Sequence, residues 1–263
     1  MNEIQKIHTH LLNGLIYIHG LCEKYDIDYY LIGGSALGAE RHSGFIPWDD
    51  DVDIGLKRDD YNKLLEVLTE SDDKSYFLQN VKTDKHYFLG YSKLRINGTL
   101  YKEKYYKDSK MHHGVSIDLF PLDKVGEDVL SSKIKFLFIK IINKVILIKY
   151  NNYPKKAILI LLFFFPLFCF SRKKLITLVT TVLKNNNKIL KPNFYVNFYG
   201  RYNLKKEKNK IEILGKPKLK KFENVLLYVP EDNKNYLTNL YGDYMKIPPI
   251  QLRETHSPVE IKL

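Results

Sequence analysis

Residues 44–56 read GFIPWDDDVDIGL, and four of the five positions from 49 to 53 are aspartates. The chain around them is basic, with a formal net charge of +12 over 263 residues. Alternate side chains of a strand face the same way, so Asp51 and Asp53 share one face, beside Asp49 if the strand begins early. Two such carboxylates, about 7 Å apart, repel by roughly 2 kcal/mol at an effective dielectric near 20, so the pattern calls for a positive partner.

A divalent cation is the partner that this acidic pattern favours. Mg²⁺ is bound by one or two carboxylates together with substrate phosphates, and Mn²⁺ accepts the same oxygen ligands. A solvated acidic turn or a set of helix-capping aspartates would give a similar local sequence. Trp48 before the cluster, and the apolar positions Val52 and Ile54 within it, place the aspartates at the mouth of a buried strand, which favours the metal interpretation.

A glycine pair lies upstream of the aspartates, in the segment IDYYLIGGS (residues 27–35). This segment predicts a buried strand that runs into a tight turn, where Gly33 and Gly34 permit close approach of the backbone and Ser35 caps the next helix. Backbone N–H groups at such a turn and helix N-terminus can hold a phosphate. A glycine-rich turn, a short helix and paired aspartates form the active-site layout of a nucleotidyltransferase-type palm.

Hydrophobic periodicity predicts an α/β (α+β) protein, with a mixed β-sheet flanked by helices. The first helix has one apolar face, made by Ile4, Ile7, Leu11, Leu15, Ile18, Cys22 and Tyr25. The expected helices cover residues 3–25, residues 35–44 and a stretch that begins at Asp59 and Asp60. The expected strands are IDYYLIGGS, DDVDIGL, HYFLGYSKLRI and GVSIDLFPL, and near the C-terminus a strand, a turn at Pro230 and a helix that ends near Gly242.

The composition changes in residues 131–183, which we expect to form a helical insertion in a single domain spanning 1–263. Its first part is apolar with interspersed lysines, and residues 157–170 read AILILLFFFPLFCF, without a charge. That run is shorter than the roughly 20 apolar residues that span a bilayer, and Pro166 would kink it. Two interpretations stay open: a buried helical hairpin, or a segment in contact with an anionic membrane surface through its flanking lysines.

Composition narrows the partners and the location. The positive charge suits phosphorylated substrates or an anionic membrane surface, and we expect no nucleic acid partner. The 20 tyrosines suit partly wet cores and sugar-facing clefts equally well. Cys22 and Cys169 form no metal-ligand spacing, which indicates free thiols in a reducing compartment. The N-terminal residues lack the pattern of a signal peptide, so we expect a cytoplasmic location, with peripheral attachment to the inner face of the cell membrane as the alternative.

The stretch GGSALGAERHSGFIPWDDDVDIGL (33–56) closely resembles the LicD family, whose members include phosphocholine transferases that act on bacterial surface glycans; fukutin-like phosphotransferases share the motif. The resemblance extends to YSKLRINGT, GVSIDLFPLD, FYGRYN and FENVLLYVPEDNKNYLTNLYGDYMKIPP. It covers most of residues 25–125 and 195–256, and residues 131–183 match none of the family's motifs.

The resemblance implies a nucleotidyltransferase-like fold and a metal-dependent transfer of a phospho-alcohol group. The donor would be a CDP-activated alcohol carrying choline, glycerol or ribitol phosphate, and the acceptor a hydroxyl of a cell-surface glycan or its lipid-linked precursor, with release of CMP. Asp51 and Asp53 would be catalytic and bind Mg²⁺ or Mn²⁺, with Asp49 as a further ligand. Asp118, in SIDLFPLD, matches the third acidic position, as a metal ligand or as the acceptor of the attacking hydroxyl's proton.

Basic groups must hold the donor's diphosphate. Arg41 precedes the aspartates, and Lys93 and Arg95 alternate on one strand face, so with Gly33, Gly34 and Ser35 they form the expected phosphate site. Each basic residue would also be explained by an ion pair to the acidic cluster. Arg201 and Tyr202, in FYGRYN, would face the acceptor sugar, and His256 is the candidate for proton transfer.

Two other functions fit the same residues. A nucleotidyltransferase would attach a nucleoside monophosphate to a small molecule, a protein or RNA and release pyrophosphate. A membrane-bound glycan-binding protein without catalysis would keep the fold, but the intact aspartates argue against it.

Overall fold

The computed structural model describes residues 1–263 except 151–164, 254 and 257. Its helices and strands follow one another as α1 (Glu3–Lys24), β1 (Tyr30–Leu31), α2 (Gly33–Arg41), β2 (Val52–Lys57), α3 (Arg58–Glu70), β3 (Tyr76–Gln79), β4 (Ser92–Ile96), β5 (Leu100–Glu103), β6 (Ser116–Val125), α4 (Val129–Tyr150), α6 (Phe165–Phe168), α7 (Arg172–Asn187), β7 (Phe194–Val196), α8 (Leu204–Glu207), β8 (Lys208–Lys210), α9 (Ile211–Leu214), β9 (Lys218–Phe222), β10 (Val225–Val229), α10 (Asn233–Tyr241) and β11 (Pro258–Lys262).

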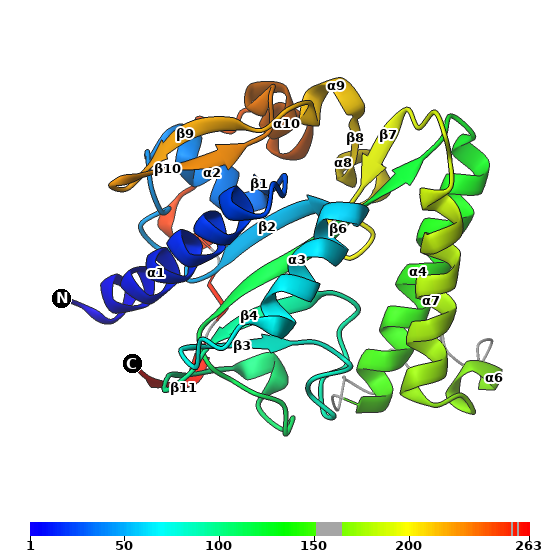
Figure 1. The fold of residues 1–263 in the computed structure, drawn as a ribbon, viewed down its shortest axis with the longest axis horizontal. Helices are drawn as coiled ribbons and strands as arrows, with labels where there is room; N and C mark the ends of the chain where they lie inside the picture. Colours follow the sequence, from blue (N-terminus) through cyan, green and yellow to red (C-terminus); the bar gives the residue numbers. More distant parts are fainter. Residues whose placement is uncertain (151–164, 254, 257) are drawn as a thin grey trace.

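The central sheet is mixed, which confirms the predicted fold class. Its strand order is β1-β2-β6-β4-β3, and β7 and β8 extend it from β6. Only the β2–β6 pair is parallel among the described neighbours of this sheet. Helices α1 and α3 cover one face (Figure 1), and α1 buries the predicted apolar stripe, including Leu11, Leu15 and Ile18. A side-chain carbon at Gly14 would lie 2.8 Å from Ile117 Cδ1, so this glycine lets α1 sit close to β6.

Helices α2 and α10 and the β9–β10 hairpin form the part of the molecule beyond β1 and β2 (Figure 1). α10 contacts α2, while β9 lies against α2 and β10 against β1. The predicted C-terminal strand and helix are confirmed, since α10 is followed at once by Gly242, whose φ of 74° is one that glycine adopts without strain.

Helices α4 and α7 form a hairpin that packs on a second core at the β6–β7 end of the sheet (Figure 1). Helices α4 and α7 therefore each bury one face against this core. Residues 157–164 of the apolar run lie outside the described residues. The side chains that this hairpin buries are Phe136, Ile139, Ile142, Val145, Ile146, Leu175, Ile176, Val179 and Leu183. Within the described residues, no helix is long and apolar enough to cross a membrane.

Three local predictions were wrong. The predicted strand at residues 27–35 has only Tyr30 and Leu31 in β1, and the predicted strand at 86–96 is shortened to β4. Residues 87–89 are instead buried in the second core under the α4–α7 hairpin. Helix α2 begins at Gly33, so Ser35 lies in its first turn and does not cap it. Strands β3 and β5 were missed.

Candidate active site

Three polar side chains form a row across the middle of the sheet. The parallel register of β2 and β6 places Asp53 opposite Asp118, and the antiparallel register of β4 and β6 places Lys93 opposite the same residue. Neighbouring strands lie about 4.8 Å apart, so the three groups are close neighbours on one face of the sheet. Lys93 Nζ lies 2.8 Å from Asp118 Oδ1 and 2.9 Å from Oδ2.

Asp53 and Asp118 of this row line a cleft with a volume of about 650 Å³. Asp49, Asp51, Asp53 and Asp118 all line it, which places the acidic residues named from the sequence in one site. Aromatic and polar side chains form the opposite walls, and six of the tyrosines belong to them: Tyr91, Tyr199, Tyr202, Tyr236, Tyr241 and Tyr244. The cleft therefore combines a carboxylate cluster with the kind of aromatic surface that suits a sugar or an organic alcohol.

The glycine turn makes room for these carboxylates. A side-chain carbon at Gly34 would lie 2.7 Å from Asp49 Oδ2, and one at Gly33 would lie 3.1 Å from Asp53 Oδ2. Gly33 also has a φ of 55°, in the left-handed region that favours glycine. Both glycines line the cleft, as predicted, but the Gly33 N–H already donates to Tyr236 Oη at 3.0 Å.

Ser35 has a different role from the one predicted. Its Oγ accepts a hydrogen bond of 2.9 Å from the backbone N–H of Asp53, and its side chain is buried. Ser35 therefore fixes the start of β2 relative to α2, and it is absent from the residues that line the cleft. The sequence prediction that it contacts phosphate is not supported by this geometry.

The charge of the acidic cluster is largely uncompensated. In the described part of the chain, the three aspartates Asp49, Asp51 and Asp53 have one ion pair with a basic residue, from His256 Nε2 to Asp51 Oδ2 at 3.6 Å. Loss of water and then the charge of Asp51 raise the pKa of Asp49 to about 8. Loss of water and then the charges of Asp51 and Asp118 raise the pKa of Asp53 well above its ordinary value. Carboxylates in this situation are a fitting site for a divalent cation.

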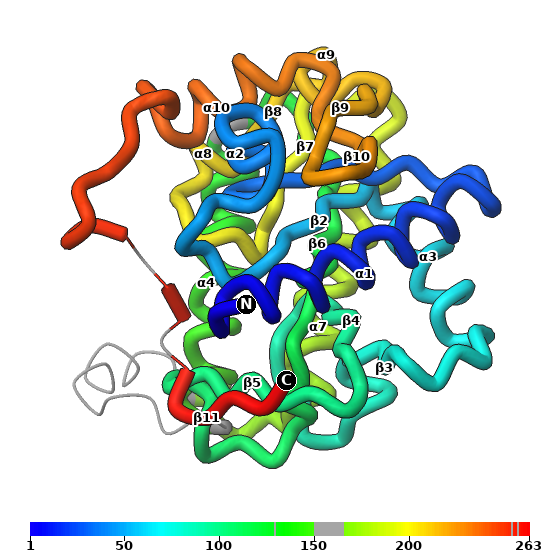
Figure 2. Tube along the Cα trace, turned by 90° about the vertical axis from the view of Figure 1, so that its left-hand side faces the viewer, coloured from blue at the N-terminus to red at the C-terminus, as the bar shows by residue number. Residues whose placement is uncertain are grey.

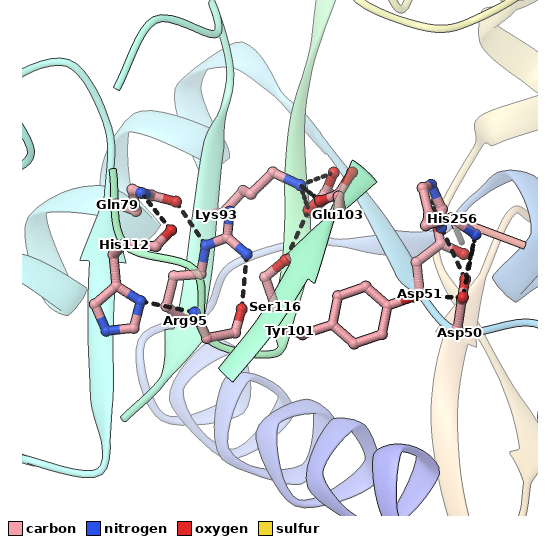
Figure 3. A network of polar contacts seen from close by, with 12 residues as sticks. Asp50, Asp51, Gln79, Lys93, Arg95, Tyr101, Glu103, His112, Ser116 and His256 are labelled. Carbon is pink, nitrogen blue, oxygen red and sulfur yellow. Dashed lines mark hydrogen bonds and ion pairs between the residues drawn. The ribbon is translucent and has the colours of Figure 1, made fainter. Parts of the chain in front are cut away.

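Asp50 belongs to the same acidic run but has different partners. It is buried, and its carboxylate accepts hydrogen bonds from Tyr101 Oη and from the backbone N–H and Nδ1 of His256 (Figure 3). Burial alone would raise the pKa of Asp50, but the hydrogen bonds from His256 and Tyr101 outweigh it and lower the pKa. Asp50, Asp51 and His256 bring one potential ligand atom each to within 4.8 Å of one another, so they too form a group that could hold a metal ion.

The three predicted basic residues have different surroundings. Arg41 lines the cleft, where its guanidinium donates to the carbonyl of Tyr244 at 2.8 Å. Lys93 forms an ion pair with Asp118, which is the alternative to phosphate binding that the sequence left open. Arg95 is a correction: its side chain is 1% exposed and donates to Gln79 Oε1 and the Gly114 carbonyl (Figure 3), so it packs the sheet and does not line the cleft.

Arg201, Tyr202 and His256 all line the cleft, as the sequence prediction requires. Sequence reasoning missed two basic residues that line the cleft, Lys246 and Arg253. The Arg253 guanidinium stacks on the ring of Trp48 with its carbon 4.0 Å from the ring centroid. The only available signal for Arg253 was that arginine is rare in this lysine-rich chain and that one lies in the C-terminal tail.

A mixed sheet that presents paired aspartates beside a glycine turn and a helix N-terminus defines a nucleotidyltransferase-type enzyme. In agreement, residues 26–142 match the family model described as LicD/FKTN/FKRP, nucleotidyltransferase domain. The lipopolysaccharide cholinephosphotransferase LicD of Haemophilus influenzae is 31% identical over 256 residues, which covers 93% of this chain and 92% of that protein. The chain therefore belongs to the LicD family of phosphotransferases.

More distant relatives share only part of the chain. The ribitol 5-phosphate transferase FKRP of human and of mouse is 50% identical over 44 residues, which is 17% of this chain and 9% of FKRP.

Proposed function

We propose that this protein transfers a phospho-alcohol group from a CDP-activated donor to a hydroxyl of a cell-surface glycan or its lipid-linked precursor, and releases CMP. Two named relatives support the reaction class, because one is a cholinephosphotransferase and the other a ribitol 5-phosphate transferase. The observation that carries the proposal is the cluster of Asp49, Asp51 and Asp53, which has little compensating positive charge and lines a cleft large enough for a nucleotide.

Asp51 and Asp53 would hold Mg²⁺ or Mn²⁺, with Asp49 as a further ligand. A cation bound there would supply positive charge that offsets the negative charge of the donor's phosphates and of the leaving CMP. Its two positive charges would also offset the repulsion that raises the pKa values of Asp49 and Asp53. His256 Nε2, held toward Asp51 by the bond from Nδ1 to Asp50, lies 3.6 Å from Asp51 Oδ2.

The acceptor step would use Asp118 on β6, the strand next to β2, as the proton acceptor. The acceptor hydroxyl oxygen bonds to the phosphorus that carries the alcohol, and the bond from that phosphorus to the oxygen bridging to CMP breaks. Asp118 takes the hydroxyl's proton, and the bridging electrons leave with CMP. Lys93 donates to both Asp118 oxygens and keeps this carboxylate beside Asp53, so a proton acceptor and the metal ligands lie on adjacent strands.

The donor's diphosphate would meet the basic side of the cleft. Arg41 is fixed by its bond to the Tyr244 carbonyl, which leaves further N–H groups of its guanidinium for phosphate oxygens. The N–H of Gly34, in the first turn of α2, would add a backbone donor. Arg201 and Tyr202 would contact the acceptor sugar from the opposite wall.

Incubation with CDP-choline, CDP-glycerol and CDP-ribitol, each with Mg²⁺ and a glycan extract, tests the proposal by CMP release. We expect one donor to give CMP at a rate that EDTA abolishes, and Asp53→Asn to remove the activity. Asp59→Asn is the matched control, because Asp59 is exposed and outside the cleft. Pyrophosphate released from a nucleoside triphosphate, with no CMP from any CDP-alcohol, would instead establish the nucleotidyltransferase alternative.

We further propose that the α4–α7 hairpin touches an anionic membrane on the side where α4 remains apolar. Although the hairpin buries one face of α4, Leu130, Ile134 and Leu137 are 69%, 59% and 62% exposed and recur at helical spacing along the other. Lys133 lies among them and is exposed as well. A cytoplasmic enzyme attached peripherally in this way would meet a lipid-linked acceptor at the inner face of the membrane.

A further inference from the structure

The C-terminal segment, which we define as residues 248–253, 255 and 256, forms one wall of the cleft. Figure 2 shows the chain after α10 running down one side of the molecule until β11 lies beside β5. Pro248, Leu252, Arg253, Thr255 and His256 from this segment line the cleft. Because the segment contains only one short 3-10 turn, Ile250–Leu252, its position depends on contacts with the rest of the protein.

Asp50 provides the central contact. Three donors reach its two carboxylate oxygens: Tyr101 Oη, the His256 backbone N–H at 3.1 Å from Oδ2, and His256 Nδ1 at 2.8 Å from Oδ1 (Figure 3). Tyr101 lies on β5 directly opposite Ile261 of β11, so the same β5 residue contacts both the C-terminal strand and the Asp50 carboxylate that holds His256. Asp50 is 8% exposed and lines no part of the main cleft.

The segment brings positive charge to an acidic cleft. Arg253 stacks on Trp48, the residue directly before the aspartate run, and its Nε donates to the Pro248 carbonyl at 3.3 Å. This arrangement holds the guanidinium in the lining of the cleft that also contains Asp49, Asp51 and Asp53. An arginine so placed can contact a phosphate with two parallel hydrogen bonds.

We propose that Asp50 is a positioning residue, which, together with Tyr101, holds the C-terminal segment closed so that Arg253 contacts the phosphates of the nucleotide donor. The identity of that ligand rests on the proposed function, whereas the position of the segment against Asp50 does not depend on it. An aspartate is needed at position 50 because three donors converge on it, whereas an asparagine would present one acceptor oxygen and two N–H groups.

Trp48 makes the position of the segment measurable without an activity assay, because it is the single tryptophan of the chain. We expect stronger quenching of Trp48 fluorescence by acrylamide in Asp50→Asn, which disrupts the bonds from His256, and in Tyr101→Phe, which removes the bond that fixes the Asp50 carboxylate. Either change lets Arg253 leave the ring. Arg253→Leu gives the reference value for an uncovered tryptophan. Glu260→Gln is the matched control on β11, because its only described ion pair, to Lys102 at 3.9 Å, is at the surface.

The kinetic readout distinguishes positioning from folding. We expect Tyr101→Phe to raise KM for the CDP-alcohol about ten-fold, the size of a lost hydrogen bond to a charged group, with a smaller change in kcat. Arg253→Leu should raise KM to a similar extent, and combining the two changes should add little, because both act through the same contact. Circular dichroism and the unfolding midpoint of Tyr101→Phe confirm that the fold is retained.

Unchanged quenching in both Tyr101→Phe and Asp50→Asn would overturn the proposal, because the segment would then be held without Asp50. Increased quenching with an unchanged KM in Tyr101→Phe would overturn the assignment of Arg253 to the donor's phosphates. If the wild-type protein turned over no CDP-alcohol, the proposed function would fail, while the quenching comparison would still decide whether Asp50 positions the segment.

Discussion

Asp53→Asn is expected to stabilise the metal-free protein while it removes activity. Asp53 lies opposite Asp118 on the adjacent strand. At a strand spacing of about 4.8 Å and an effective dielectric near 20, two such charges repel by roughly 3 kcal/mol. Lys93 is on the far side of Asp118, at about twice that spacing, so its attraction to Asp53 offsets about half of this energy.

The net repulsion across the sheet that Asp53→Asn removes is therefore about 1–2 kcal/mol. For a chain of this size that corresponds to a rise in Tm of about 2–6 °C. The same change removes a metal ligand, which we expect to lower kcat/KM by about 10²–10³-fold.

The assay is thermal unfolding of the wild-type protein, Asp53→Asn and Asp59→Asn, in EDTA and in excess Mg²⁺. The wild-type protein should gain stability from Mg²⁺, and Asp53→Asn should be more stable than wild type in EDTA and respond little to the ion. Asp59 lies in the first turn of α3, so Asp59→Asn should lose about 0.3–1 kcal/mol in both buffers and keep the Mg²⁺ response. If Asp53→Asn were destabilised in EDTA and still gained the wild-type increment from Mg²⁺, neither the repulsion nor the ligand role of Asp53 would stand.

Lys93→Met leaves the Asp118 carboxylate unpaired in a largely buried position, and urea titrations should show a loss of about 3–5 kcal/mol; an unchanged midpoint would mean that this ion pair contributes little. Arg95→Met should lower stability but leave the donor's KM per folded molecule unchanged, and a raised KM would return Arg95 to the phosphate site. Ile134→Ser with Leu137→Ser should weaken sedimentation with phosphatidylglycerol vesicles at unchanged Tm, because both side chains are exposed; a wild-type protein that stays in the supernatant would refute the membrane contact.

The local sequence pattern was sufficient to predict much of the fold. The stripe of α1, the acids in the first turn of α3 and the Gly242 stop of α10 are set by residues that lie near one another in the sequence. Strand lengths were less predictable, because burial of residues 87–89 depends on the α4–α7 hairpin, which is distant in the sequence. Apolar content alone does not distinguish a strand from a buried loop.

In the candidate site, too, local features could be predicted from the sequence, whereas contacts between strands could not. The alternation of Asp51 and Asp53 on β2 could be predicted, but the row with Asp118 and Lys93 requires the register between β2, β6 and β4. Arg95 was misassigned because β3, which supplies Gln79 as its partner, was not predicted.

The different role of Asp50 also could not be predicted, since its donors come from β5 and from the C-terminal segment. Alternation along the strand indicates only that Asp50 faces away from Asp49 and Asp51, and it gives no indication of the partners that Asp50 meets there.

The central claim is that the cleft directs attack to the phosphorus that carries the alcohol. Slow turnover of the preferred CDP-alcohol in H₂¹⁸O, without acceptor and with Mg²⁺, tests it by mass spectrometry of the two products. The account predicts ¹⁸O in the released phospho-alcohol and none in CMP. Label in CMP, with an unlabelled phospho-alcohol, would show attack on the nucleotide's own phosphorus and contradict it.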